Sequence, residues 1–373
     1  MRISFAAIAL ALVVPAFTVP ALAQPAPAPA QASQLPPDPL HRDWHAFWIT
    51  HPTAPLREPL VLRFRRALTL YAVPPSYIVR VSADNRFILY VNGQRVGDGP
   101  ARGDLDHWRY ERFDLAPFLH TGQNLVAATV WNWGVYAPVA QFTNRTAFLL
   151  ESEATGADSI STPQGWRVEE DPGRTPLPRS TLTYTAYYAS GPGEKVDAAQ
   201  TDWNWDSATS TGQWLRPGNP MRESPYPGTN RARSADTTEE NPWGLLPNTL
   251  PHQQYTPINP GHIVSLDTIA AEQPGLSTFP ASPATFPPHC HVHILLDRNT
   301  LTTAYPALTV SGGKGSAIWL TYSEALFDDH FHKADRNALT YTDAKDIVHQ
   351  RRALGLRDEF LPDGGSHRTF QPL

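Results

Sequence analysis

Short apolar runs separated by turn-forming residues follow one another along the chain from about residue 44 onward. They are rich in β-branched and aromatic side chains, which are enriched in strands. The clearest runs in the first half lie at residues 60–65, 77–81, 87–91, 125–131 and 147–151. Asn92-Gly93 directly follows the third run, and Asn-Gly between apolar runs is the strongest local signal for a hairpin. Short strands at regular spacing predict a sandwich or jelly roll.

A second set of strand-like runs lies at residues 291–296, 308–311 and 316–322. Residues 191–260 are poor in apolar runs and rich in Trp, Pro, Asn and Ser, which predicts long ordered loops with a few edge strands. Helical patterns are scarce: residues 114–119 suit one helical turn, and residues 343–354 suit a short helix. The predicted fold class is therefore all-β, with tandem jelly-roll-like β-sandwich domains and long loops.

The N-terminus has the pattern of a secretory signal peptide. Arg2 precedes an apolar stretch, and Ala21-Leu22-Ala23 supplies small residues before a cleavage site at Gln24. Pro15 and Pro20 interrupt the stretch, which is short for a membrane span of ~20 residues. We therefore expect export, to the periplasm or the medium, and no membrane span after cleavage.

These patterns predict five segments. Residues 1–23 are the signal peptide, 24–41 a Pro/Ala-rich linker, 42–190 the first sandwich, 191–260 a loop-rich connection and 261–373 the second sandwich. Because a strand pattern is barely begun at Phe370, we expect the second sandwich to be incomplete at its C-terminus.

Composition excludes several classes of function. The net charge of −5 and the absence of a basic stripe argue against nucleic acid as a partner. The single cysteine, Cys290, excludes an internal disulfide framework, and we expect it to be a buried apolar residue. Tryptophan, tyrosine and proline are abundant, which favours β-rich folds and weakly favours sugar-stacking surfaces.

Two stretches together resemble bacterial α-L-rhamnosidases of glycoside hydrolase family 78. In residues 87–131, FILYVNGQRVGDGP leads through an Asp-containing loop to a second strand. In residues 305–336 the segments SGGKG and YSEAL occur, followed at residues 358–364 by DEFLPDG. The connecting GPGEKVDA at residues 191–198 also fits. These stretches are similar to the N-terminal β-sandwich regions of that family.

The resemblance implies a secreted protein related to enzymes that remove terminal L-rhamnose with inversion. In that family two carboxylates, ~6.5–9.5 Å apart, act from a helical barrel that follows the sandwiches. No helix-rich region is found in this sequence, so the family's catalytic acids have no counterpart to carry over. We expect rhamnose-containing oligo- or polysaccharides as partners. Two alternatives stay open for the barrel: a separate partner chain that carries it, or an interrupted gene.

Some sandwiches of that family resemble calcium-assisted rhamnose-binding modules, and four residues are candidates for such a role. Asp84, Asn85 and Asn132 lie on or beside strand ends, and their oxygens suit both calcium and sugar hydroxyls. The alternative is ordinary turn chemistry. Trp108, in a polar-aromatic cluster, is either a stacking platform for a sugar or a core residue. No cofactor is expected to be required, and calcium near Asp84 and Asn132 is the one candidate ion.

The remaining candidates are weaker. His289, His291 and His293 alternate, but three such residues span ~13 Å, too far for one metal ion. Glu324 and Asp363 resemble glycosidase acids, yet their motifs belong to the sandwich and not to the barrel, so neither is predicted to be catalytic.

The predicted function is the non-catalytic N-terminal portion of a secreted α-L-rhamnosidase-like hydrolase that supports or binds rhamnosylated glycans. Two alternatives stay open: a free-standing carbohydrate-binding module, and an active glycosidase with an unrecognised site.

Overall fold

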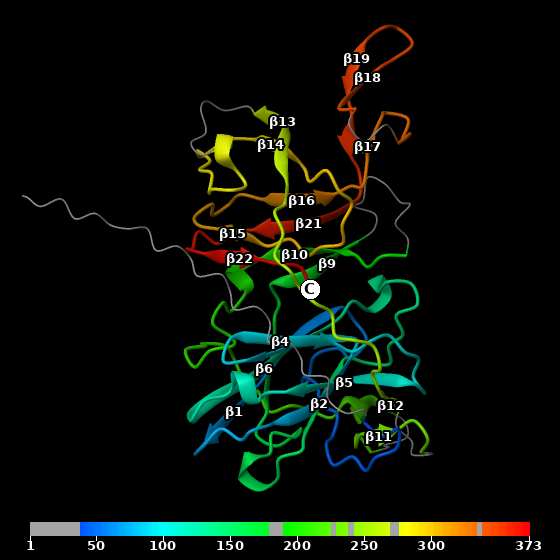
Figure 1. Cartoon of the computed structure of the whole chain (residues 1–373), viewed down its shortest axis with the longest axis vertical. Coiled ribbons are helices and arrows are strands. Elements are labelled where there is room, and N and C mark those ends of the chain that lie inside the picture. Colours follow the sequence, from blue (N-terminus) through cyan, green and yellow to red (C-terminus); the bar gives the residue numbers. More distant parts are fainter. Residues whose placement is uncertain (1–37, 179–188, 225–228, 238–241, 269–275, 334–337) are drawn as a thin grey trace, which may run out of the picture.

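The computed structural model describes residues 38–178, 189–224, 229–237, 242–268, 276–333 and 338–373. The predicted signal peptide and most of the linker lie outside these residues. The described part of the chain is all-β, with several sheets and only short 3₁₀ turns as helical elements. It forms two stacked bodies, one built mainly of β1 to β8 and the other around β9, β10, β16 and β21 (Figure 1).

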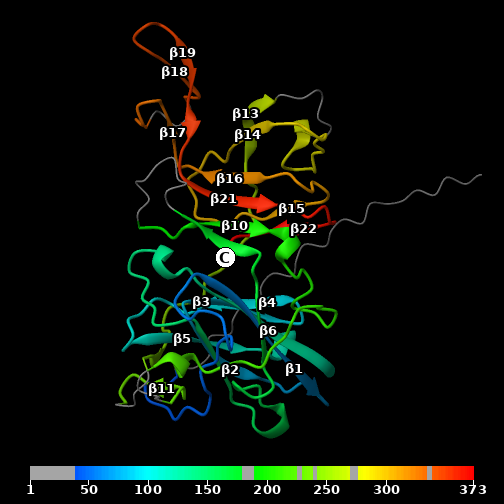
Figure 2. The ribbon, with the colours of Figure 1, turned by 180° about the vertical axis from the view of Figure 1, so that it is seen from behind.

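The first body is a sandwich of two five-stranded sheets. One sheet has the order β4 (Gln94–Gly99), β3 (Arg86–Val91), β6 (Gly122–Asn132), β1 (Leu60–Leu70) and β8 (Arg167–Glu170). The other has the order β11 (Arg233–Ser234), β12 (Gly244–Pro247), β5 (Trp108–Asp114), β2 (Ile78–Asp84) and β7 (Ala147–Ser152). Figure 2 shows the same two layers from behind.

The alternation seen in the sequence determines which side chains lie between the two sheets. Leu62 and Phe64 of β1 are fully buried in the core, whereas Arg63 between them points to the opposite face of the same sheet. Phe64 stacks on Phe148 of the facing sheet with ring centroids 5.0 Å apart. Aromatic pairs of this kind tie the two layers together.

The predicted Asn-Gly hairpin is confirmed. Asn92 and Gly93 join β3 to β4 with φ values of 53° and 75°, and both central residues of a type I′ turn require positive φ. The single helical turn predicted at residues 114–119 is also present, as the 3₁₀ turn η1 (Ala116–Phe118). The remaining short turns are η2 (Gly134–Tyr136), η3 (Gly156–Asp158), η5 (Ala198–Gln200), η6 (Pro220–Glu223) and η7 (Leu276–Thr278).

The second body is built on a four-stranded sheet. Its order is β16 (Ile318–Tyr322), β21 (Leu356–Leu361), β10 (Gly193–Asp197) and β9 (Arg174–Leu177). Four strand pairs accompany it: β13 (His262–Thr268) with β14 (Val292–Asp297), β15 (Leu308–Val310) with β22 (Arg368–Phe370), β17 (Leu326–Phe327) with β20 (Arg352–Ala353), and β18 (Thr340–Thr342) with β19 (Val348–Gln350).

Sheet membership does not follow the segments expected from the sequence. β9 precedes residue 190 but pairs with β10 of the second body, and β12 lies in the loop-rich segment but pairs with β5 of the first. The helix predicted at residues 343–354 is wrong, because these residues form the turn and return strand of the β18–β19 hairpin, which projects from the second body (Figure 1).

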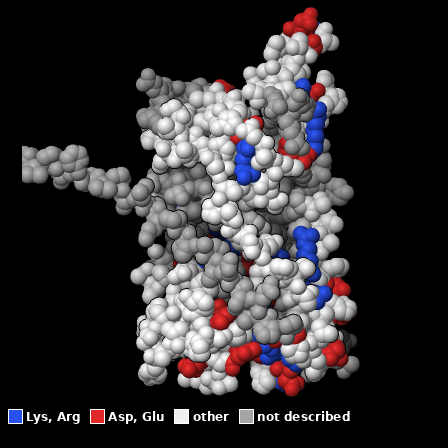
Figure 3. Space-filling model, in the orientation of Figure 1, with Lys and Arg blue, Asp and Glu red and all other residues white. Residues whose placement is uncertain are grey.

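Both broad faces of the first sandwich are covered. On the outer face of β5 and β7, the segment from Trp44 to Trp48 packs with Trp243, and the rings of Trp48 and Trp243 lie 4.5 Å apart. On the outer face of the other sheet, Val61 and Trp131 pack with Leu373. The molecular surface in Figure 3 carries Lys and Arg groups beside Asp and Glu groups. No described helix has the length and apolar character needed to cross a bilayer.

Candidate functional site

The structure brings Asp84, Asn85 and Asn132 together where β2 and β6 end. Thr143 joins them, since its hydroxyl donates to Asp84 Oδ1 at 2.6 Å and accepts from Asn132 Nδ2 at 2.8 Å. Asn85 Nδ2 also donates to Asp84 Oδ1, at 2.8 Å. The three residues chosen from the sequence thus form one hydrogen-bonded cluster.

The Asp84 carboxylate accepts hydrogen bonds on both oxygens. In addition to Thr143 and Asn85 at Oδ1, three donors reach Oδ2: Asn144 N at 2.7 Å, Arg145 N at 3.2 Å and Trp243 Nε1 at 3.0 Å. Burial raises the pKa of Asp84 to about 6, and the donated hydrogen bonds act in the opposite direction.

This arrangement does not fit a calcium ion. Calcium takes six to eight oxygen ligands, whereas the atoms around the Asp84 carboxylate are N–H and O–H donors. Asn132 Oδ1 is likewise occupied, because it accepts from Gly134 N at 2.9 Å. Asp84 and Asn132 are fully buried and Asn85 is 3% exposed. The geometry is that of a closed structural network of buried side chains.

Trp108 is also buried, with 2% of its surface exposed. It packs in the aromatic layer with Trp44 and Trp48, and its Nε1 donates to Ala83 O at 3.3 Å. Stacking on a sugar needs an exposed ring face. The core alternative for Trp108 is therefore the one that the structure displays, and its proposed role in sugar binding has no geometric support here.

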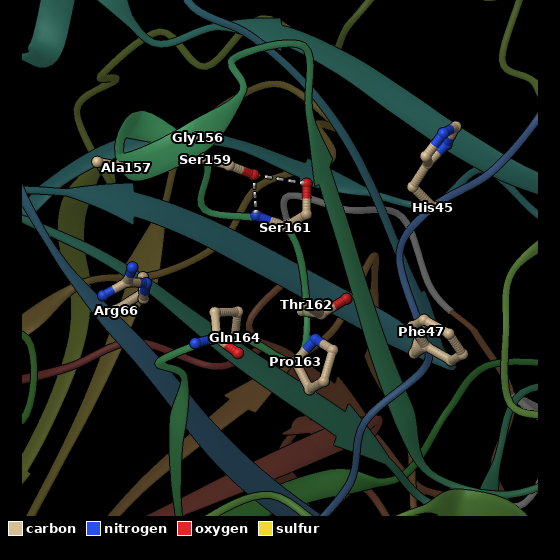
Figure 4. Close-up of a pocket in the computed structure, with 10 residues that line it drawn as sticks. All are labelled: His45, Phe47, Arg66, Gly156, Ala157, Ser159, Ser161, Thr162, Pro163 and Gln164. Atoms are coloured by element: carbon tan, nitrogen blue, oxygen red, sulfur yellow. Dashed lines mark hydrogen bonds between the residues drawn. The ribbon is translucent and has the colours of Figure 1, made fainter.

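A surface pocket of about 450 Å³ opens at the rim of the first sandwich (Figure 4). It lies between the N-terminal segment, β1 and the loop that carries η3. Its lining side chains include His45, Phe47, Arg66, Ser159, Ser161 and Gln164. Small-molecule pockets usually have ~300–1,000 Å³, so the volume of this pocket lies within the usual range.

The serine side of the pocket is held in place by local hydrogen bonds. Ser161 Oγ accepts from Ser152 N at 3.0 Å, and Ser159 Oγ lies 3.3 Å from Ser161 Oγ. The η3 turn is fixed from below because the Tyr77 hydroxyl donates to Asp158 O. On the other side, Phe47 N donates to Thr162 O at 3.0 Å. The pocket is thus preorganised by hydrogen bonds both within the loop and to distant segments.

Comparison with known proteins gives the fold a context. No protein family and no curated protein matches the chain. Among solved structures, the chain is similar to an α-L-rhamnosidase from Aspergillus terreus, with a TM-score of 0.51, 15% identity, and coverage of 88% of this chain and 33% of that one. An α-L-rhamnosidase from Dictyoglumus thermophilum gives a TM-score of 0.50 and 14% identity, covering 88% and 32%.

The chain has the fold of a part of an α-L-rhamnosidase. The resemblance that the sequence motifs indicated is therefore confirmed for the fold, and the match is partial. The chain spans about a third of the length of the two rhamnosidases it matches, 32% and 33%.

The other candidate residues of this rhamnosidase-like chain do not line the pocket. Glu324 is ion-paired with Lys333, and Asp363 with Arg368 at 2.8 Å. Asp363 Oδ1 also accepts from Gly365 N at 2.8 Å, which makes the predicted turn.

The histidine pattern is only partly strand-like. The rings of His291 and His293 lie 4.7 Å apart, but His289 has a φ of 60° and precedes β14. Cys290 is half-buried, not buried as expected. Within the described ranges, no group of three or more His, Cys, Asp or Glu side chains is placed to hold a metal ion.

Sequence reasoning missed the pocket entirely. Its residues come from three segments, near residues 45, 66 and 160, and none of these segments carries a motif. Only Arg66 offered a signal. It belongs to the run Arg63-Phe64-Arg65-Arg66, where a third arginine breaks the alternation that places Arg63 and Arg65 on one face.

Proposed function

We propose that this chain is the non-catalytic portion of a secreted α-L-rhamnosidase-like hydrolase and that it supports or binds rhamnosylated glycans. Its shared fold with part of two α-L-rhamnosidases is the starting point. In this proposal the bond-breaking acids belong to a helical barrel on a separate chain or segment, and the sandwiches present the glycan to it.

The observation that carries the proposal is the chemistry of the rim pocket. Its ten lining residues offer hydroxyl, amide, imidazole and guanidinium groups and an aromatic ring, but no carboxylate. Inverting hydrolysis needs one carboxylic acid and one carboxylate facing each other across the sugar. The pocket is therefore equipped to hold a saccharide and not to cleave it with such a pair.

The buried carboxylates near the contact between the two bodies support the same conclusion. Asp171 is ion-paired with Arg63 at 2.5 Å, and Glu194 is ion-paired with Arg174. Asp358 accepts from the Tyr322 hydroxyl at 2.5 Å and from Glu194 N at 2.6 Å. Groups committed to such partners act as structural anchors.

Two measurements on the purified chain test this function. The first is incubation with 4-nitrophenyl α-L-rhamnopyranoside, for which we expect no release of nitrophenol above the buffer rate. The second is titration calorimetry with L-rhamnose and with a rhamnosylated oligosaccharide, with and without calcium, for which we expect heat from the oligosaccharide under both conditions.

Each rival has its own signature. Rhamnoside turnover that disappears in Glu324→Gln or Asp363→Asn would establish the active glycosidase, with those carboxylates as its acids. Absence of heat with every rhamnosylated ligand would remove glycan binding. Heat that depends on calcium would support a calcium site at Asp84, although N–H and O–H donors surround that carboxylate.

A further inference from the structure

The rim pocket contains a cation without a counter-ion. Among the described residues, Arg66 has no carboxylate within ion-pair distance, and its guanidinium makes one hydrogen bond, from Nη1 to Ala67 O at 2.8 Å. An arginine side chain carries five N–H donors in a planar fork. Most of the donor capacity of Arg66 is therefore uncommitted within the described structure.

The guanidinium lies close to the backbone of Gly165. Gly165, with a φ of +72°, lies so close beneath it that an added Cβ would come within 2.6 Å of Arg66 Cζ and Nη1. Any side chain at position 165 would displace the guanidinium, and positive φ also favours glycine there. The backbone thus forms a platform for a half-buried guanidinium at the wall of the pocket.

The rest of the lining suits a sugar ring. In Figure 4, Ser161 and Gln164 lie between Arg66 on one side and His45 and Phe47 on the other. Serine hydroxyls and the glutamine amide each donate and accept hydrogen bonds, as sugar hydroxyls require. The half-buried ring of Phe47 offers an apolar surface for the C–H face of a pyranose.

We propose that this pocket binds a saccharide unit that carries a carboxylate, such as a hexuronate. The Arg66 guanidinium pairs with the carboxylate, while Ser159, Ser161 and Gln164 bind the ring hydroxyls. Charge-assisted hydrogen bonds from arginine to a carboxylate are short and strong, and the planar fork matches the two oxygens. This inference goes beyond the rhamnose binding proposed above, because rhamnose itself is uncharged.

Calorimetry with three probes at equal ionic strength tests the chemical class of the ligand. D-galacturonate carries the carboxylate, D-galactose is the same ring with a neutral C6, and sodium sulfate supplies an anion without a ring. We expect galacturonate to bind at least about tenfold more tightly than galactose, the factor expected for one hydrogen bond to a charged group. Sulfate should bind more weakly than galacturonate.

Matched variants test the role of Arg66. Arg66→Gln should weaken galacturonate binding about tenfold and leave the galactose affinity unchanged. Arg216→Gln removes an exposed arginine outside the pocket and should change neither. Gln164→Glu adds a carboxylate at an exposed lining position and should repel galacturonate without perturbing the fold. Melting curves establish that each variant is folded.

Three results would overturn the inference: equal affinity for galacturonate and galactose, equal affinity for galacturonate and sulfate, or unchanged galacturonate affinity in Arg66→Gln. None of these results bears on rhamnose binding or on rhamnoside turnover. Failure of this inference is therefore distinguishable from failure of the function proposed above.

Discussion

Replacing Asp84 by alanine tests how much the hydrogen-bonded cluster around it contributes to the free energy of unfolding. The carboxylate accepts five hydrogen bonds, from two side chains at Oδ1 and from two backbone amides and Trp243 at Oδ2. These donors come from sequence positions as far apart as 85 and 243. Alanine leaves all five donors without their acceptor in a fully buried site.

The size of the effect follows from the number of abandoned donors. A water molecule entering the vacated space can accept from about two of them. The three that remain cost about 1 to 1.5 kcal/mol each, so we expect the free energy of unfolding to fall by about 3 to 5 kcal/mol. For a domain of this size that corresponds to a fall in Tm of about 6 to 20 °C.

Thermal and urea denaturation at pH 7, followed by tryptophan fluorescence, measures this change. Asp43→Ala, at an exposed position, is the matched control and should stay within about 0.5 kcal/mol of the parent. Asp84→Asn keeps one acceptor oxygen and should recover part of the loss. A melting temperature for Asp84→Ala within about 2 °C of that for Asp43→Ala would refute the reasoning. A fall of about 3 kcal/mol in the free energy of unfolding lowers the Tm of a cooperative domain by more than that.

Three further substitutions probe separate parts of the molecule. Trp243→Phe retains a ring against Trp48 but loses the N–H that donates to Asp84. Urea denaturation should therefore show that the free energy of unfolding falls by about 1.5 to 3 kcal/mol. Arg174→Ala leaves Glu194, which is 3% exposed, without its cation. We therefore expect the free energy of unfolding to fall by about 3 kcal/mol, and amide exchange to be faster in β10 than in β1. Burial raises the pKa of Glu169 to about 7 from 4.5. The free energy of unfolding of the parent should therefore fall by about 1 to 2 kcal/mol relative to that of Glu169→Gln as the pH rises from 4.5 through 7. Equal dependence of the two unfolding free energies on pH would contradict this.

The parts of the fold predicted correctly depend on local patterns. The alternation in β1 and the Asn92-Gly93 turn act over a few residues, so sequence alone suffices for them. The failed helix shows the limit of such patterns. The predicted helix begins at Asp343, but Asp343 Oδ1 accepts from Lys345 N and Ile347 N, and Asp346 adopts a φ of 62°. These contacts close a hairpin turn instead.

The candidate cluster could be found from the sequence, but its closed, buried character has a long-range cause. Strand ends predicted that Asp84 and Asn132 would lie near each other, and they do. Their burial depends on Thr143 and on Trp243, which is far away in the sequence. A pattern search along the chain does not reveal which distant segment covers a polar group. The pocket escaped for the same reason, since its walls come from three unrelated segments.

The way in which the first sandwich is covered directs ligands to its rim. One broad face lies beneath the aromatic layer of Trp48 and Trp243, and the opposite face beneath the contact between Trp131 and Leu373. The Asp84 carboxylate, which lies beneath the aromatic layer, has both oxygens occupied by structural partners. The pocket beside Arg66 lies at the rim, where the loop at residues 156–164 supplies most of the lining (Figure 4). In a sandwich covered on both faces in this way, loops at the rim are where binding chemistry is accessible to solvent, so a glycan that binds the described part of the chain should contact residues 156–164 before it contacts either sheet.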